Sequence, residues 1–160
     1  MLPPFVILLS QVVVMSDSFS TLHFYLHAAP KETREVVQVV IREQSLERWL
    51  LEPTDQSCEL RVSFEQFLEG LEKLPGSFVE WDGSFIWRPQ GPGGAWLEGN
   101  VYDGQSGVQN VECKVHGTLP EFETLLNLLG WPAQAMVIQW VSEGVYLSVS
   151  SALRLVSVSS

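Results

Sequence analysis

The chain has 160 residues, of which 46% are hydrophobic and 11% aromatic, and this composition excludes a disordered, collagenous or repeat-fibre protein. With 19 acidic and 9 basic side chains the formal net charge is −10, which argues against binding to nucleic acid or to an anionic membrane surface. A chain of this length can bury one core, so we expect a single domain.

The N-terminal residues 2–15, LPPFVILLSQVVVM, are apolar but fall short of the about 20 residues that a membrane-spanning helix needs. The segment also lacks the basic start and the cleavage site of a signal peptide. We therefore predict a poorly ordered extension at residues 1–18, with Met15 a more natural start than Met1. The prediction is a cytoplasmic protein with one domain at 19–156 and a frayed tail at 157–160. Export or N-terminal anchoring is the alternative.

Strict alternation of apolar and polar residues after residue 20 predicts a half-buried strand. Its two faces carry Leu22, Phe24 and Leu26 on one side, and His23, Tyr25 and His27 on the other. On a strand the two histidines are about 13 Å apart and cannot share a metal ion, so a solvent-facing edge strand explains them. β-Branched residues within 34–43 favour a second strand, joined to the first by a hairpin at 29–33, although a helix there is the alternative.

Capping boxes of the Ser/Thr-x-x-Glu/Gln type precede two amphipathic helices, which are predicted at residues 63–74 and 119–129. Ser63 opens the first box and Thr118 the second. A shorter helix is expected near residues 45–51, where a proline stops it.

The remaining strands are expected at residues 78–81, 84–87, 95–102, 108–116, 135–142 and 145–150. An Asp-Gly turn joins the first two of them as a hairpin. Together these elements predict an α+β domain with a mainly antiparallel mixed sheet, two amphipathic helices and a short third helix.

Motifs that announce cofactor or metal chemistry are absent from the sequence. Cys58 and Cys113 lie far apart without the spacing of a zinc site, so we predict two reduced, structural thiols. The chain has no dinucleotide-binding glycine loop, P-loop, zinc-protease motif or EF-hand, and Ser106 lacks the strand-turn-helix setting of a nucleophile elbow. No cofactor is expected from these motifs.

One candidate site comes from the strands at 95–102 and 108–116. If Tyr102 faces Val108 across the turn, Glu98 lies opposite Glu112, with Lys114 on the same face. Two carboxylates directly across a ladder repel each other unless a cation lies between them, and either Lys114 or a divalent ion such as Mg²⁺ supplies one. Glu98 and Glu112 are therefore candidate metal ligands. The alternative is a solvated strand surface that needs no catalysis.

These residues resemble the PD-(D/E)xK nuclease superfamily, in which an acidic residue on one strand and an E-x-K on the next hold Mg²⁺. Glu98 matches the first acid, and Glu112 and Lys114 match the E-x-K. The order of helices and strands from residue 63 onward is similar to the αβββαβ core of that superfamily. The resemblance implies Mg²⁺ ligands at Glu98 and Glu112 and a catalytic Lys114 that orients or activates water. The proline and aspartate that name the motif are absent. The chain is also similar to uncharacterised bacterial proteins, which implies no activity.

A second candidate site is aromatic. Closing the hairpin at 78–87 as a two-residue turn places Phe78, Phe85 and Trp87 on one face, and both faces of this hairpin are apolar. If helices cover only one face of the sheet, this row is a surface for a protein partner; if a helix covers each face, it belongs to the core. The first function predicted is a small acidic interaction or regulatory domain without catalysis. The alternative is a Mg²⁺-dependent nuclease or phosphodiesterase.

Overall fold

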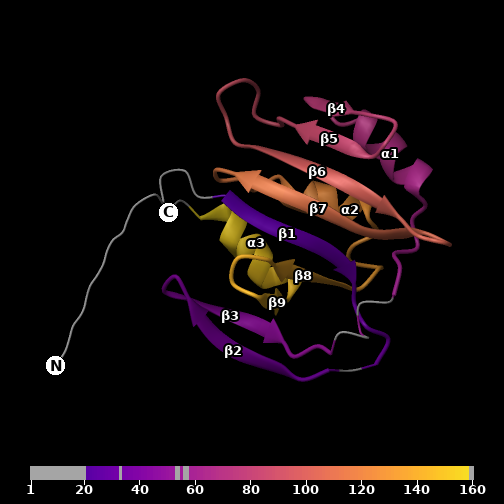
Figure 1. Ribbon diagram of the computed structural model, residues 1–160. Coiled ribbons are helices and arrows are strands. Elements are labelled where there is room, and N and C mark those ends of the chain that lie inside the picture. The colour runs from indigo at the N-terminus through magenta and orange to yellow at the C-terminus, as the bar shows by residue number, and fades with distance from the viewer. Residues whose placement is uncertain (1–20, 33, 53–54, 56–57, 159–160) are drawn as a thin grey trace.

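The computed structural model describes residues 21–32, 34–52, 55 and 58–158, and in these residues one antiparallel sheet packs against three helices (Figure 1). The strands are β1 (Thr21–Ala28), β2 (Val36–Ile41), β3 (Gln44–Trp49), β4 (Ser77–Val79), β5 (Ser84–Trp87), β6 (Trp96–Asp103), β7 (Val108–His116), β8 (Met136–Trp140) and β9 (Val145–Leu147). The helices are α1 (Phe64–Glu72), α2 (Phe122–Leu128) and α3 (Val149–Ser157). The extension predicted at residues 1–18 lies outside the described residues.

The strands follow the order β2-β3-β9-β8-β1-β7-β6-β5-β4, and every pairing among them is antiparallel. The α+β class with a mainly antiparallel sheet is confirmed, but a mixed sheet is not, because parallel pairs are missing among the described strands. β1 lies at the centre of the sheet, and β2 lies at one end. The predicted β1–β2 hairpin and the edge position of His23 and His27 are therefore wrong. Alternation identifies a strand, but its neighbours here come from distant parts of the chain.

The helices cover one face of the sheet. In Figure 1, α2 lies behind β6 and β7. Side chains from α1 and α2, among them Phe67 and Phe122, pack against alternate residues of the strands in one core. The Phe24 and Phe122 rings are 5.9 Å apart between centroids. Alternate residues contribute to this core along β1, β6 and, from Val111 onward, β7. The other set points away from the helices and forms what we call the open face.

The two predicted amphipathic helices begin differently. α1 has the predicted capping box: the Ser63 hydroxyl accepts the backbone N–H of Gln66, and the Gln66 side chain accepts the backbone N–H of Ser63, each at 3.1 Å. α2 begins after Glu121, which makes no side-chain cap, so the box predicted from Thr118 is not formed. Pro120 explains the later start, because a proline disfavours helical backbone at the residue before it.

Residues 45–51, predicted to be helical, lie largely in β3, which pairs with both β2 and β9. A tight hairpin joins β2 to β3 through Arg42 and Glu43, whose φ angles are 54° and 65°. Turns with two positive φ angles normally carry Asn or Gly. Because Arg42 and Glu43 occupy those positions instead, the sequence carries no turn signal for this hairpin.

The last strand ends at Leu147 instead of residue 150, and it is followed by α3, a helix that was not predicted from the sequence. The Ser148 hydroxyl caps α3 by accepting the backbone N–H of Ser151 at 3.2 Å. The buried apolar stripe of α3 consists of Val149, Ala152, Leu155 and Val156. This helical spacing is present in the sequence, but the serines between these residues are typical of a disordered end, so the sequence did not predict a helix here. Ser157, assigned to that end, is the last residue of the helix.

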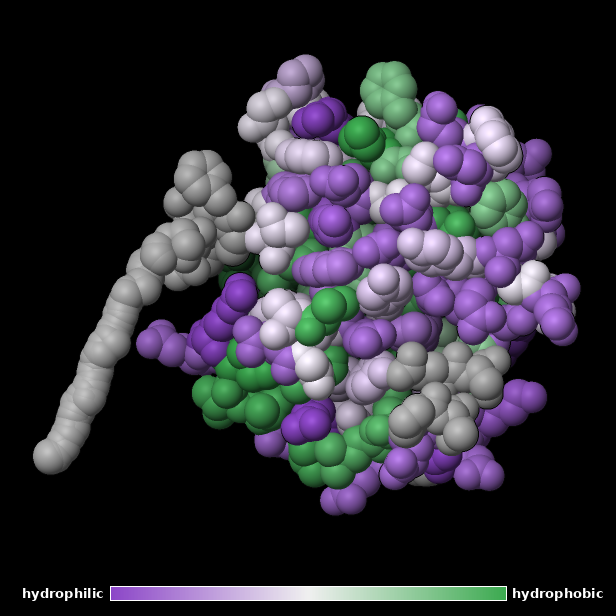
Figure 2. All heavy atoms as spheres, viewed as in Figure 1, coloured by the Kyte–Doolittle hydropathy of each residue, from purple (hydrophilic) through white to green (hydrophobic). Residues whose placement is uncertain are grey.

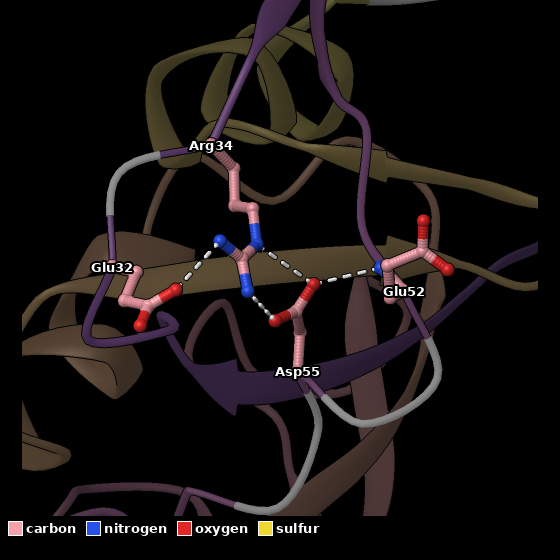
Figure 3. Close-up of polar contacts among 4 residues, drawn as sticks. All are labelled: Glu32, Arg34, Glu52 and Asp55. Carbon is pink, nitrogen blue, oxygen red and sulfur yellow. Dashed lines mark hydrogen bonds and ion pairs between the residues drawn. The ribbon is translucent and has the colours of Figure 1, made fainter.

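A charged cluster ties the loop before β2 to the loop after β3 (Figure 3). The Arg34 guanidinium donates to both oxygens of Asp55, through Nε at 3.0 Å and through Nη2, and its Nη1 donates to Glu32 at 3.2 Å. The backbone N–H of Glu52 donates to Asp55 at 2.7 Å. These hydrogen bonds hold the pKa of Asp55 below its usual value, and those from Arg34 have the largest effect. Since Asp55 is only 7% exposed, the cluster is a structural clamp on the two loops.

Candidate functional site: the open face of the sheet

The open face gathers every histidine and every tyrosine of the chain. They come from four strands: His23, Tyr25 and His27 of β1, Tyr102 of β6, His116 of β7, and Tyr146 of β9. Figure 2, drawn from the same direction as Figure 1, shows hydrophilic side chains across the middle of this view. The face opposite α1, α2 and α3 is therefore polar and rich in titratable groups.

Glu98, Glu112 and Lys114 share the open face, but the register between their strands differs by two residues from the predicted one. Glu98 lies opposite Lys114, and Asn100 lies opposite Glu112. β6 continues to Asp103, and a bulge beside that residue shifts the ladder. The two carboxylates therefore do not face each other directly, and the repulsion that motivated a metal ion between them is removed.

The turn between β6 and β7 is held by Glu59, a residue that no motif in the sequence marks. Its carboxylate accepts the backbone N–H groups of Gln105 at 2.9 Å, Ser106 at 2.8 Å and Gly107 at 2.9 Å, and the Ser106 hydroxyl at 2.9 Å. These donors lower the pKa of Glu59 to about 2. Ser106 thus serves as a hydrogen-bond donor within the turn.

Glu112 is the centre of a hydrogen-bonded cluster formed by three neighbouring strands. His23 Nε2 donates to its Oε2 at 2.7 Å, and the Tyr102 hydroxyl donates to its Oε1 at 2.9 Å. Partial burial alone would raise the pKa of Glu112, but the hydrogen bonds from His23 and Tyr102 outweigh burial and hold the pKa below its usual value. Both carboxylate oxygens have protein donors, and the side chain is only 16% exposed.

A second Glu–His pair lies near the end of β7. His116 Nε2 donates to Glu98 Oε2 at 2.9 Å. The His116 ring stacks on Trp96 with centroids 4.2 Å apart, and the Arg88 guanidinium lies 4.5 Å from the centroid of a Trp96 ring. This stack of a cation and two rings holds His116 in place, while the Glu98 side chain stays 44% exposed.

A pocket of about 430 Å³ lies on the open face, over β4 to β7. Its lining includes Phe78, Glu80, Ile86, Glu98, Glu112 and Lys114. Three carboxylates and one ammonium group make the pocket acidic. The structure therefore brings Glu98, Glu112 and Lys114 together with Phe78, although the two candidate sites were predicted separately.

The aromatic row predicted in the β4–β5 hairpin is not formed. Phe78 lies opposite Ile86 and is 71% exposed, whereas Phe85 and Trp87 point to the helices and are each 3% exposed. The turn has three residues instead of two and ends at Gly83, whose φ is 97°. A one-residue change of register exchanges the faces of a strand, so two of the three residues predicted to bind a partner are core residues.

Both cysteines are free thiols in the structure, with Cys113 buried and Cys58 half-buried. Burial raises the pKa of the Cys113 thiol, which keeps it protonated. Within the described ranges, no three His, Cys, Asp or Glu side chains gather in a way that could hold a metal ion. The metal-ligand roles of Glu98 and Glu112 and the catalytic role of Lys114 stay predictions.

The helices in the described part of the chain are all too short or too polar to cross a membrane. Comparisons of the chain with protein-family models, with curated proteins and with solved structures find no match. Its function must therefore be argued from the residues of the open face.

Proposed function

We propose that the protein is a binding domain without catalysis, and that the pocket on its open face receives a basic segment of a partner protein. The observation that carries this proposal is the composition of the pocket. The carboxylates of Glu80 and Glu98 stand beside the exposed side chains of Phe78 and Ile86. Lysine and arginine have an apolar stem and a charged head, so such a pocket complements both parts of these side chains.

The charge of the whole protein favours the same class of partner. The net charge of −10 attracts a cationic chain over long range and accelerates its association, whereas it repels nucleic acid and anionic lipid. Trp81, which follows Glu80 in the β4–β5 turn, is 88% exposed. An exposed indole ring is a favourable surface for an arginine guanidinium.

The pocket is also largely preformed. Its walls are strands instead of long loops, and Glu98 and Glu112 are oriented by hydrogen bonds from His116 and His23. A surface that is already ordered loses little conformational entropy when a partner binds. Lys114, opposite Glu98, keeps part of the acidic charge balanced in the absence of a partner.

Titration of isotope-labelled protein with a short arginine-rich peptide tests the proposal, with a glutamate-rich peptide of the same length as the negative probe. We expect chemical-shift changes at the pocket residues, and affinity that falls as salt is added. The double variant Glu80→Gln/Glu98→Gln is expected to weaken binding roughly three- to tenfold.

The matched control is Glu69→Gln/Glu123→Gln, which removes the same charge from exposed positions on α1 and α2. This variant should bind the arginine-rich peptide as the wild type does, apart from a small long-range effect. If the two double variants weakened binding equally, the affinity would depend only on the net charge of the protein, and a role for the pocket would be refuted.

A further inference from the structure

β2 forms one end of the sheet, and within the described ranges no strand pairs with its outer side. Such an edge presents unpaired N–H and C=O groups to any strand that approaches. Edge strands are usually protected by charged residues, proline or a bulge. Residues 36–41, Val-Val-Gln-Val-Val-Ile, have none of these, and Val36 and Val40 are 43% and 72% exposed.

The sequence of this edge is self-complementary. Residues 36–40 read Val-Val-Gln-Val-Val in both directions. If two copies pair antiparallel about a two-fold axis at Gln38, Val36 of each copy lies opposite Val40 of the other. Every valine then meets a valine, and directly opposed β-branched residues stabilise a sheet.

The backbone of β2 is oriented for this register. The N–H of Leu50 donates to the C=O of Glu35 at 3.0 Å, so the polar groups of residue 35 point inward, toward the β3 side. Alternation along a strand then directs the N–H and C=O groups of Val36, Gln38 and Val40 outward. These are the residues that a two-fold axis at Gln38 pairs with one another. Paired residues also share a face, so the helix-covered side of one copy continues into that of the other.

We infer that the protein forms a two-fold dimer through antiparallel β2–β2 pairing centred on Gln38. The net charge of −10 opposes the approach of two copies, but residues 36–41 carry no charged side chain, so no like charges meet within the paired strands. The pocket lies over β4 to β7 at the opposite end of the sheet, so dimerisation leaves it accessible. The inference is independent of the proposed binding function.

Sedimentation of the full chain over a range of concentrations tests the dimer. Gln38→Pro removes an outward N–H without removing a β2–β3 hydrogen bond, so we expect a folded monomer with an unchanged circular dichroism spectrum. Gln38→Thr keeps the N–H and should stay dimeric. Val40→Lys places like charges at the edge and serves as a second monomeric variant if Gln38→Pro does not fold. A wild type that stays monomeric, or a dimer that survives both substitutions, would overturn the inference.

Cysteine cross-linking tests the register, in a Cys58→Ser background so that only the buried Cys113 remains. Under mild oxidation, Gln38→Cys is expected to form a disulfide-linked dimer, because the two positions face each other across the axis. Val40→Cys alone should not form a cross-linked dimer, since residue 40 of one copy lies several residues along the strand from residue 40 of the other. A mixture of Val36→Cys and Val40→Cys chains should form one, because these two positions face each other. Cross-linking by Val40→Cys alone, or none by Gln38→Cys, contradicts the register.

Discussion

Glu98 lies directly opposite Lys114 on the open face, in a cross-strand pair of β6 and β7. Lys114 therefore places one positive charge among the three carboxylates of the pocket. The stabilisation expected from the pairing of Glu98 with Lys114 is small, because an exposed cross-strand charge pair contributes little.

We predict that Lys114→Ala lowers the free energy of unfolding by about 0.2 to 1 kcal/mol, the range for a cross-strand charge pair. Urea denaturation measures the change, with Lys31→Ala in a loop as the control. In the peptide titration, the same variant should bind the arginine-rich peptide slightly more tightly, because it removes a positive charge from the pocket. Weaker binding by Lys114→Ala would show that the lysine contacts the partner.

A second prediction separates the binding domain from the Mg²⁺-dependent nuclease. Bound metal stabilises the folded state by mass action, so millimolar Mg²⁺ or Mn²⁺ would raise the melting temperature if Glu98 and Glu112 were ligands. We expect the same melting temperature with and without either metal, because His23 and Tyr102 already donate to both oxygens of Glu112. A metal-induced rise that Glu112→Gln abolishes would establish a metal site instead.

Glu59 is expected to make the stability of the folded protein depend on pH in the acidic range. Its pKa is about 2 in the folded protein, against an ordinary value of 4.5, so its contribution is present above pH 4.5 and is lost as the pH falls toward 2. Glu59→Gln should therefore destabilise the protein at neutral pH and flatten the decline in stability below pH 4.5. Melting curves at several pH values check this, with Glu123→Gln on α2 as the control. A parallel decline in wild type and Glu59→Gln would mean that other carboxylates cause the acid sensitivity.

His27 adds a separate pH dependence at higher pH. It is 6% exposed, and burial lowers its pKa, although its hydrogen bond to Gln139 at 2.9 Å opposes the shift. The unfolded state binds the proton more readily, so stability should fall as the pH drops below about 6.5. His27→Phe is expected to remove this step in the melting temperature, whereas His116→Phe is expected to retain it. Persistence of the step in His27→Phe would assign it to another group.

Local patterns in the sequence were sufficient for the elements that depend on nearby residues alone. Alternation predicted β1, β6 and β7, and with them the common face of Glu98, Glu112 and Lys114. The Ser63 capping box predicted where α1 begins. These features follow from backbone periodicity and from hydrogen bonds over three residues, so a short stretch of chain determines them.

Register and neighbours were decided only by the tertiary structure. The Gly83 turn and the bulge at Asp103 changed which residues face each other, although each affects only one or two backbone positions. Glu112 meets His23 across 89 residues of sequence, because β1 inserts between β7 and β8. No local pattern encodes such a contact, since it depends on how apolar faces from the whole chain are buried together.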